Sequence, residues 1–215
     1  MSTIDADQAV AHLTASDPRL AGVIVRVGPF AGWPEPEDPF SSLLRAVVFQ
    51  QLSGKAASTI HRRFLQSFPQ PAEDALRVPD PAEVLALDEE QFRAAGLSRQ
   101  KTLSIRDLAL HAASGELDGA AIEAMSDEDA IATLTRVRGV GRWTAEMYLM
   151  FHLGRPDVLP TGDLGINRAI QLLYDLPALP KPPEVLRIGE PWRPWATVAC
   201  WYLWRSEDVK LAVPQ

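Results

Sequence analysis

Apolar residues recur every three or four positions along most of the chain, and turns rich in proline and glycine separate the segments that carry this pattern. Such spacing is typical of amphipathic helices, which bury one face. Start signals, such as Asp80 before Pro81, support several of them. The segments predicted to be helical are residues 5–14, 17–27, 41–67, 72–77, 81–86, 88–95, 98–113, 118–124, 126–137, 142–153, 163–174, 182–190 and 194–205. No alternating pattern indicates paired strands, so we expect an all-α fold.

Two proline-rich connectors, Pro29 to Pro39 and Pro177 to Pro183, interrupt this pattern. After the first connector, we expect Ser41 to be the N-cap of a strong helix, because its hydroxyl can accept a hydrogen bond from the first turn. At 215 residues, the chain is long enough to bury a substantial core, in one domain or in two small ones.

The stretch with most chemical information is a glycine turn between two predicted helices. Gly139 is well placed as a left-handed helix stop, and Gly141 lets a backbone or a ligand approach the start of the next helix. The first amides and the positive dipole end of that helix form a ready anion site. Alone, this spacing indicates only a tight turn. Neighbouring positive charge and the Trp143-Thr144-Ala145 continuation favour a DNA phosphate as ligand; the charged residues are Arg136, Arg138 and Arg142.

This segment resembles the helix-hairpin-helix of DNA base-excision glycosylases, whose pattern runs roughly L-x-x-(I/V)-x-G-(I/V)-G-x-(W/K)-T-A. The resemblance implies that the hairpin binds duplex DNA. The residues in contact would be Gly139, Val140, Gly141, Arg142 and Thr144. In that family, hairpin carbonyls also hold a monovalent cation, Na⁺ or K⁺, and no other cofactor is required. By position, these carbonyls belong to Thr135, Val137 and Val140.

Asp163 follows the helix-breaking Leu159-Pro160-Thr161-Gly162 and starts the next predicted helix. An acidic residue in that place is, by itself, an ordinary helix cap. The resembled family, however, pairs its hairpin with a Gly/Pro-rich loop that ends in an essential Asp, and LPTGD matches that loop. The resemblance therefore implies that Asp163 is catalytic, stabilising the sugar cation and orienting or deprotonating water. Asp157, the nearest rival carboxylate, is interpreted as a structural turn residue.

Trp143 stands where relatives that also cut the strand have a lysine nucleophile, which forms a Schiff base with the sugar. Lys101 and Lys181 are remote in sequence and do not replace it. The resemblance thus narrows to monofunctional, water-using enzymes. Among these, the chain is most similar to the DNA-3-methyladenine glycosylase II group of the helix-hairpin-helix/Gly-Pro-Asp superfamily.

Such an enzyme flips its target base into a pocket with flat, apolar walls, and a cationic alkylated purine gains from aromatic faces. Trp143 is one expected wall, and Trp201 matches the family's base-facing tryptophan. Met147 stands where relatives often have tyrosine, so the pocket is expected to be more open or more adaptable. The preference among 3-methyladenine, 7-methylguanine, 1-methyladenine and ethenoadenine stays open. The other C-terminal tryptophans are expected to be mostly structural: Trp192, Trp195 and Trp204.

The Gln-Gln-Leu-Ser segment resembles the element that fills the gap left by the flipped base. Gln51 is the expected intercalating residue, and Leu52 is the alternative. Gln50 is interpreted either as part of that element or as a side chain that satisfies buried backbone groups. Lys55 either contacts a phosphate or is solvated.

The net charge of −7 argues against a strongly electrostatic grip on DNA and predicts weak, salt-sensitive binding through few phosphates. Cys200 is the only cysteine, which excludes an intrachain disulfide, a cysteine-based zinc site and a four-cysteine iron–sulfur cluster. We expect it in the core. No run of 18 apolar residues and no signal-peptide pattern is present, so we expect no membrane segment and a cytoplasmic monomer.

The resemblance spans residues 40 to 205 and implies two helical domains flanking a cleft. Residues 39–154 would form one domain, and residues 1–38 with 155–215 the other. The predicted function is a monofunctional DNA glycosylase that flips alkylated purines and hydrolyses the N-glycosidic bond. The alternatives are a non-enzymatic hairpin module that binds DNA, and a glycosylase for other lesions, including a glycosylase/lyase for oxidised bases.

Overall fold

The computed structural model describes residues 4–33, 37–70 and 76–208. These ranges contain thirteen α-helices, one short 3-10 helix and no strand, so the prediction of an all-α fold is confirmed. Most of the helix predicted at 72–77 lies outside the described residues. The chain divides into two compact units. The terminal unit comprises Met1–Glu35 and Leu149–Gln215, and the central unit comprises Pro36–Tyr148.

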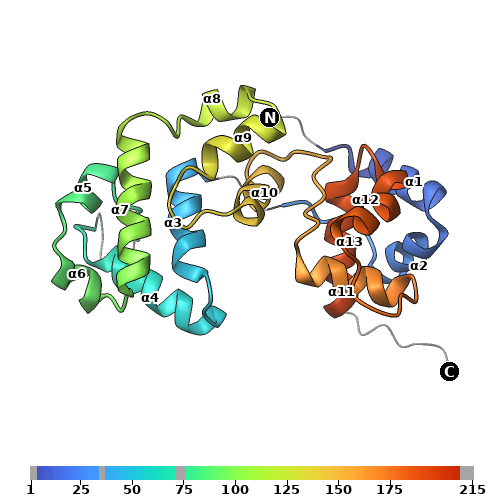
Figure 1. The fold of residues 1–215 in the computed structure, drawn as a ribbon, viewed down its shortest axis with the longest axis horizontal. Helices are drawn as coiled ribbons and strands as arrows, with labels where there is room; N and C mark the ends of the chain where they lie inside the picture. The colour runs from blue at the N-terminus through green and yellow to red at the C-terminus, as the bar shows by residue number, and fades with distance from the viewer. Residues whose placement is uncertain (1–3, 34–36, 71–75, 209–215) are drawn as a thin grey trace. The chain divides into compact units, whose positions relative to one another are not determined.

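The central unit is built around its longest helix, α7, which packs against α3 and α5 (Figure 1). Leu43 and Leu44 of α3 and Ile105 and Leu108 of α7 are fully or almost fully buried between these helices. The bounds of its helices are α3 Pro39–Phe49, α4 Gly54–Gln66, α5 Pro81–Ala86, α6 Glu89–Ala94, α7 Arg99–Ala113, α8 Gly119–Ala124 and α9 Asp127–Leu134. α10, Arg142–Phe151, starts in this unit, and its last residues belong to the terminal unit.

The terminal unit joins both ends of the chain around α13, which packs against α2 and α11 (Figure 1). Its helices are α1 Ala6–Ser16, α2 Pro18–Val27, α11 Leu164–Leu173, α12 Pro182–Gly189, the 3-10 helix η1 Glu190–Trp192, and α13 Ala196–Asp208. Asp17 connects its parts: the buried carboxylate caps α2 and accepts hydrogen bonds from the Trp192 indole N–H (2.7 Å) and from the Tyr174 hydroxyl. Cys200 is buried in this core, as predicted.

The start of α3 differs from the prediction. Asp38, and not Ser41, is the N-cap; its carboxylate accepts hydrogen bonds from the Ser41 amide (3.0 Å) and from the Ser41 hydroxyl. Pro39 occupies the first helical position, where its fixed φ suits a helix and its missing N–H costs nothing. The Asp-Pro pair is therefore the stronger start signal, and the serine is one turn inside the helix.

The single helix predicted at 41–67 is also wrong, because residues 50–53 form a turn between α3 and α4. Gln51 adopts a left-handed backbone with φ of 58°, which is uncommon for a residue with a Cβ. Ser53 then caps α4. We call residues 50–53 the wedge turn.

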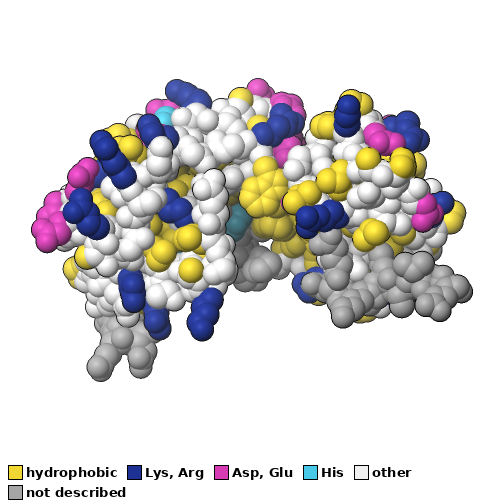
Figure 2. Space-filling model, turned by 60° about the horizontal axis from the view of Figure 1, so that its bottom comes forward, with side chains coloured by type: hydrophobic (Ala, Val, Ile, Leu, Met, Phe, Trp, Pro, Cys, Tyr) yellow, Lys and Arg dark blue, Asp and Glu magenta, His cyan; other side chains and the backbone are white. Residues whose placement is uncertain are grey.

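Figure 2 shows Lys and Arg side chains spread over the visible face, with acidic side chains among them. In the part of the chain that the structure describes, no helix is both long and apolar enough to cross a membrane.

Candidate functional site

Asp163 caps α11 and is held by two hydrogen bonds to the same carboxylate oxygen. Oδ1 accepts the Ile166 amide at 2.8 Å and the Trp204 indole N–H at 3.0 Å. The preceding LPTG turn is closed by a bond from the Asp163 amide to the Pro160 carbonyl (3.0 Å). The side chain of Asn167 donates to the Thr161 carbonyl (3.1 Å). Asp163 is only 7% exposed, so a partly desolvated carboxylate sits at the positive end of a helix.

The hairpin between α9 and α10 reverses the chain at Gly139, whose φ is +81°. A Cβ built on Gly139 would lie 2.6 Å from the Ser104 hydroxyl of α7, so both the backbone and the space require glycine. Gly141 has open space around it, and its carbonyl accepts the Ala145 amide (3.0 Å), as an N-cap carbonyl does. The first turn of α10 therefore begins at an open glycine, which suits a bound anion.

The wedge turn is tied to the hairpin. The Gln50 side-chain amide donates to the Gly139 carbonyl at 2.9 Å. Lys101 of α7 donates to the carbonyls of Val48 and Gln50, the latter at 2.8 Å, and so satisfies the end of α3. Burial lowers the pKa of Lys101. Gln50 therefore bonds to an exposed backbone carbonyl, and not to the buried backbone groups that one interpretation of the sequence expected.

A family model described as "HhH-GPD superfamily base excision DNA repair protein" matches residues 44–194. The "DNA-3-methyladenine glycosylase 1" of Schizosaccharomyces pombe is 38% identical over 81% of this chain and 75% of its own length. A second protein of that yeast, "Alkylbase DNA glycosidase-like protein mag2", is 32% identical over 94% of this chain and 93% of its own length. A solved structure of the S. pombe 3-methyladenine DNA glycosylase in complex with abasic DNA covers 96% of this chain and 100% of its own, with a TM-score of 0.84 and 34% identity. The chain belongs to the HhH-GPD superfamily and to its 3-methyladenine DNA glycosylase family.

In this HhH-GPD protein, five aromatic residues cluster beside Asp163 in the terminal unit. The Trp204 ring lies 5.8 Å from Phe151 and 6.5 Å from Trp33. Phe30 contacts both Trp33 (6.0 Å) and Trp201 (5.1 Å) edge-on. Sequence reasoning selected only Trp201 from this cluster, because the other rings come from segments far apart. The one available signal was Trp204, which lies one helical turn after Trp201.

The α10 residues selected from the sequence differ in exposure. Trp143 is 48% exposed, which is unusual for a tryptophan, and Met147, one turn later on the same face, is half-buried. The Thr144 side chain is buried, so a contact from this residue to DNA would be made by its backbone amide. Tyr148 is also buried, which raises the pKa of its hydroxyl to about 12.

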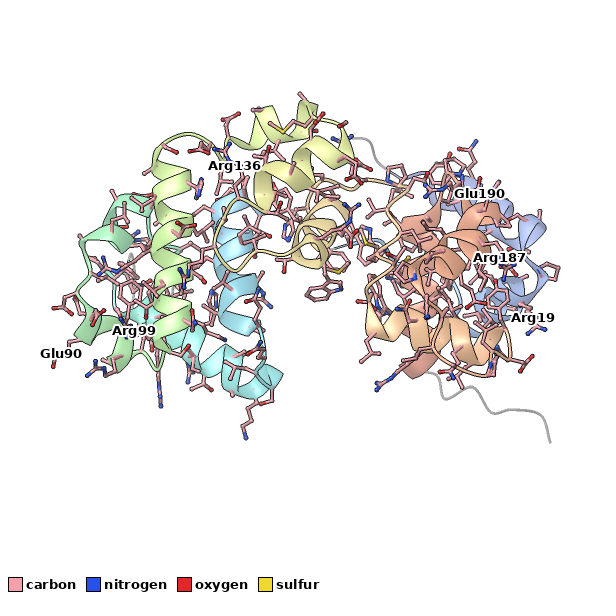
Figure 3. The ribbon with its side chains drawn as sticks, in the orientation of Figure 1. Arg19, Glu90, Arg99, Arg136, Arg187 and Glu190 are labelled. Atoms are coloured by element: carbon pink, nitrogen blue, oxygen red, sulfur yellow. The ribbon has the colours of Figure 1, made fainter. Side chains whose placement is uncertain are left out.

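The arginines of the hairpin are engaged with protein groups. Arg142 pairs with Glu128 (2.5 Å) and with Glu146 (2.9 Å). The bonds with Glu128 raise the pKa of Arg142 and lower that of Glu128. Arg136 pairs with Glu116 (3.0 Å). In Figure 3, Arg136 lies near the C-terminal end of α7, and Arg99 lies at the N-terminal end. The positive charge expected around the phosphate is thus largely balanced by carboxylates.

Two further residues have structural roles that agree with the sequence analysis. Asp157 binds Arg193 (2.7 Å) and accepts the Ala196 amide at the start of α13 (3.3 Å). Trp192 is fully buried.

Proposed function

We propose that this protein hydrolyses the N-glycosidic bond of alkylated purines in duplex DNA, without cutting the strand, as a step of base excision repair. The observation that carries this proposal is the placement of Asp163. The carboxylate is buried at the end of the LPTG turn, oriented by two donors, beside a cluster of aromatic rings. The membership in the 3-methyladenine DNA glycosylase family supports the choice of substrate.

The chemistry follows from the charge of the substrate. Alkylation at a ring nitrogen makes the purine cationic, so the departing base keeps the electron pair of the glycosidic bond and leaves neutral. The sugar becomes an oxocarbenium-like cation, which the ionised Asp163 stabilises. Water then adds to the anomeric carbon and loses its proton to the same carboxylate. The exposed face of Trp143 favours the cationic base, by about 0.5–2 kcal/mol. Trp201 is buried, and the Arg205 guanidinium already lies 5.2 Å from the centroid of its ring.

Binding and base flipping are assigned to the central unit. A backbone phosphate binds at Gly139 to Gly141, where α10 starts, and the exposed side chain at the tip of the wedge turn fills the gap in the stack. Gln51 has this role, with Leu52, 39% exposed, as the alternative. Extrusion of the base costs roughly a few kcal/mol, which this side chain offsets.

We propose a monovalent cation as a structural ligand of the hairpin. Its donors would be the backbone carbonyls of Thr135, Val137 and Val140, and carbonyl oxygens suit hard cations. In the described ranges, no group of three or more His, Cys, Asp or Glu is placed to bind a metal ion. Such a cation would add positive charge next to the bound phosphate.

The test is the Asp163→Asn variant with methylated duplex DNA. Asparagine also caps helices well, so the fold is expected to persist. We expect release of free 3-methyladenine and 7-methylguanine to fall at least about 100-fold, while binding to abasic-site DNA is kept. Asp157→Asn is the matched control and should release base at the wild-type rate. Borohydride should trap no covalent adduct with the wild-type protein.

Three other outcomes would each contradict one part of the proposed function. Full release by Asp163→Asn would remove the catalytic assignment. A wild-type protein that binds damaged DNA and releases no base would be the non-enzymatic hairpin module. A borohydride-trapped adduct would indicate a glycosylase/lyase.

A further inference from the structure

Two hydrogen-bond donors from different helices bind the Asp163 carboxylate. The Ile166 amide is fixed by the first turn of α11, and the Trp204 indole comes from α13. Both bonds end on Oδ1, at 2.8 and 3.0 Å. The bond from the Ile166 amide alone leaves the carboxylate plane adjustable, because the carboxylate can pivot about this hydrogen bond. The second donor restricts that rotation.

Trp204 is itself held by its neighbours. The ring is half-buried and packs at a 46° tilt against Phe151, with centroids 5.8 Å apart, and edge-on to Trp33. These contacts fix the indole and therefore the direction in which its N–H points. A side chain already ordered in this way loses little conformational entropy when it forms the bond.

Gly165 has no side chain, and this leaves the space in which the Asp163 carboxylate and the Trp204 indole form their hydrogen bond. A Cβ at this position would lie 3.2 Å from Asp163 Oδ1, 3.2 Å from Trp204 Cδ1 and 3.4 Å from Trp204 Nε1. Gly165 lies in the first turn of α11 without a positive φ, so the backbone does not require glycine there. Glycine in a helix costs roughly 1 kcal/mol relative to alanine. The close contacts give a reason for this residue at this position.

We propose that Trp204 is a positioning residue for the reaction, which holds Oδ1 of Asp163 and thereby fixes the carboxylate plane against the sugar, in a space that Gly165 keeps open. The inference rests on the proposed function, since it assigns the orientation of the carboxylate that performs the hydrolysis. It also changes the role of Trp204 from a structural aromatic residue to a hydrogen-bond donor at the reaction site.

The first test is Trp204→Phe, which keeps an aromatic ring and removes the N–H donor. Hydrogen bonds to charged groups are among the stronger ones in proteins. We expect the single-turnover rate of 7-methylguanine release to fall at least about 10-fold, with the Kd for abasic-site DNA and the Tm nearly unchanged. Trp195→Phe, in the same unit, is the matched control and should keep the wild-type rate.

The second test is a double-mutant cycle. Because Trp204 acts through Asp163, Trp204→Phe should cause no further loss in the Asp163→Asn background. Gly165→Ala should also slow release, since the new methyl group displaces the indole or the carboxylate. Gly22→Ala, at a helical glycine of α2 with open space around it, is the control and should leave the rate unchanged.

The outcomes separate the two proposals. If Asp163→Asn is inactive and Trp204→Phe has the wild-type rate, the positioning role is wrong and the proposed function stands. If Asp163→Asn is active, the proposed function loses its catalytic residue. A Trp204→Phe variant that loses Tm and DNA binding together with rate, or that slows release equally in the Asp163→Asn background, would show a merely structural role.

Discussion

At the scale of single residues, the hairpin depends on one position that accepts only glycine. Gly139 has a positive φ, and its missing side chain leaves room for the Ser104 hydroxyl of α7. Gly141, two residues later, has neither constraint within the protein. The two glycines therefore serve different purposes: the first allows the hairpin to pack on α7, and the second leaves room for a ligand.

Gly139→Ala should destabilise the protein, since a left-handed backbone costs a residue with a Cβ about 1–2 kcal/mol and the overlap with Ser104 adds to it. We expect a Tm lower by about 5 °C. Gly141→Ala should leave the Tm unchanged and weaken binding to abasic-site DNA. Thermal unfolding and fluorescence anisotropy separate the two effects. Equal Tm losses in both variants would contradict this division of roles.

His61 gives the stability a pH dependence. Burial lowers its pKa below the usual 6.5, nearby Arg45 lowers it further, and Glu37 opposes this shift. The ring packs edge-on against Phe49, 6.0 Å away. The unfolded chain binds a proton near pH 6.5, and the folded protein binds one only at lower pH. The free energy of unfolding should therefore fall as the pH decreases below 6.5.

Urea unfolding at a series of pH values between 7.5 and 5 measures this effect. His61→Asn removes the titrating group, so its stability should change less over that interval. A wild-type slope that survives unchanged in the variant would assign the pH dependence to other groups.

At the scale of elements, α7 supports both segments that are proposed to contact DNA. Lys101 bonds to the end of α3, Ser104 faces Gly139, and Asp107 accepts the Arg138 amide at 2.7 Å. These positions recur every three residues along α7, and so they lie on one side of the helix. Gln50 completes the arrangement by bonding the wedge turn directly to the hairpin.

Gln50→Leu should remove this link at only a small cost in the free energy of unfolding, because the bond is exposed and water can replace the lost donor. We expect base release to slow more than this loss of stability explains, because the wedge turn is no longer held in register. Stopped-flow fluorescence of a base analogue beside the lesion reports the flipping step. Gln100→Leu, which removes an exposed bond to Arg138 only, is the control.

The sequence predicted most helices, and the failure at the wedge turn has its reason in tertiary contacts, whereas the start of α3 was missed although Asp38-Pro39 is a local signal. Asp80-Pro81 gave an accurate start for α5, because a cap signal acts within one turn. The wedge turn contains neither proline nor glycine, and the next glycine, Gly54, already belongs to α4, so no local signal predicts the end of α3. At that end, Lys101, far along the chain, donates to the carbonyls of Val48 and Gln50. The partners of Trp204 were missed for the same reason.

At the scale of the whole molecule, a net charge of −7 has to be reconciled with DNA binding. Carboxylates pair with Arg142 and Arg136, whereas the Arg138 guanidinium donates to the neutral Gln100, so part of the positive charge at the hairpin is compensated. Backbone amides remain as further phosphate ligands. Few counterions are then released on binding, so the affinity should fall as salt is added, as the net charge predicts, but with a small slope.

Affinity for abasic-site DNA measured between 50 and 300 mM salt should give a log–log slope of about −2 to −4. Glu128→Gln releases part of the hold on Arg142, so this variant should bind DNA more tightly and steepen the slope by about 1. Arg142→Gln provides the comparison, since it removes the charge itself. A Glu128→Gln variant with weaker binding and an unchanged slope would contradict this account.

The bond from Gln50 to the Gly139 carbonyl has a consequence for the search along DNA. If the hairpin grips a phosphate while the wedge turn probes the stack, the number of nucleotides between the gripped phosphate and the inspected base pair is constant. Because a strand has a direction, this fixed offset permits inspection of only one strand in a given orientation. The protein must then turn around on the duplex, or leave it and rebind, before it can examine the complementary strand.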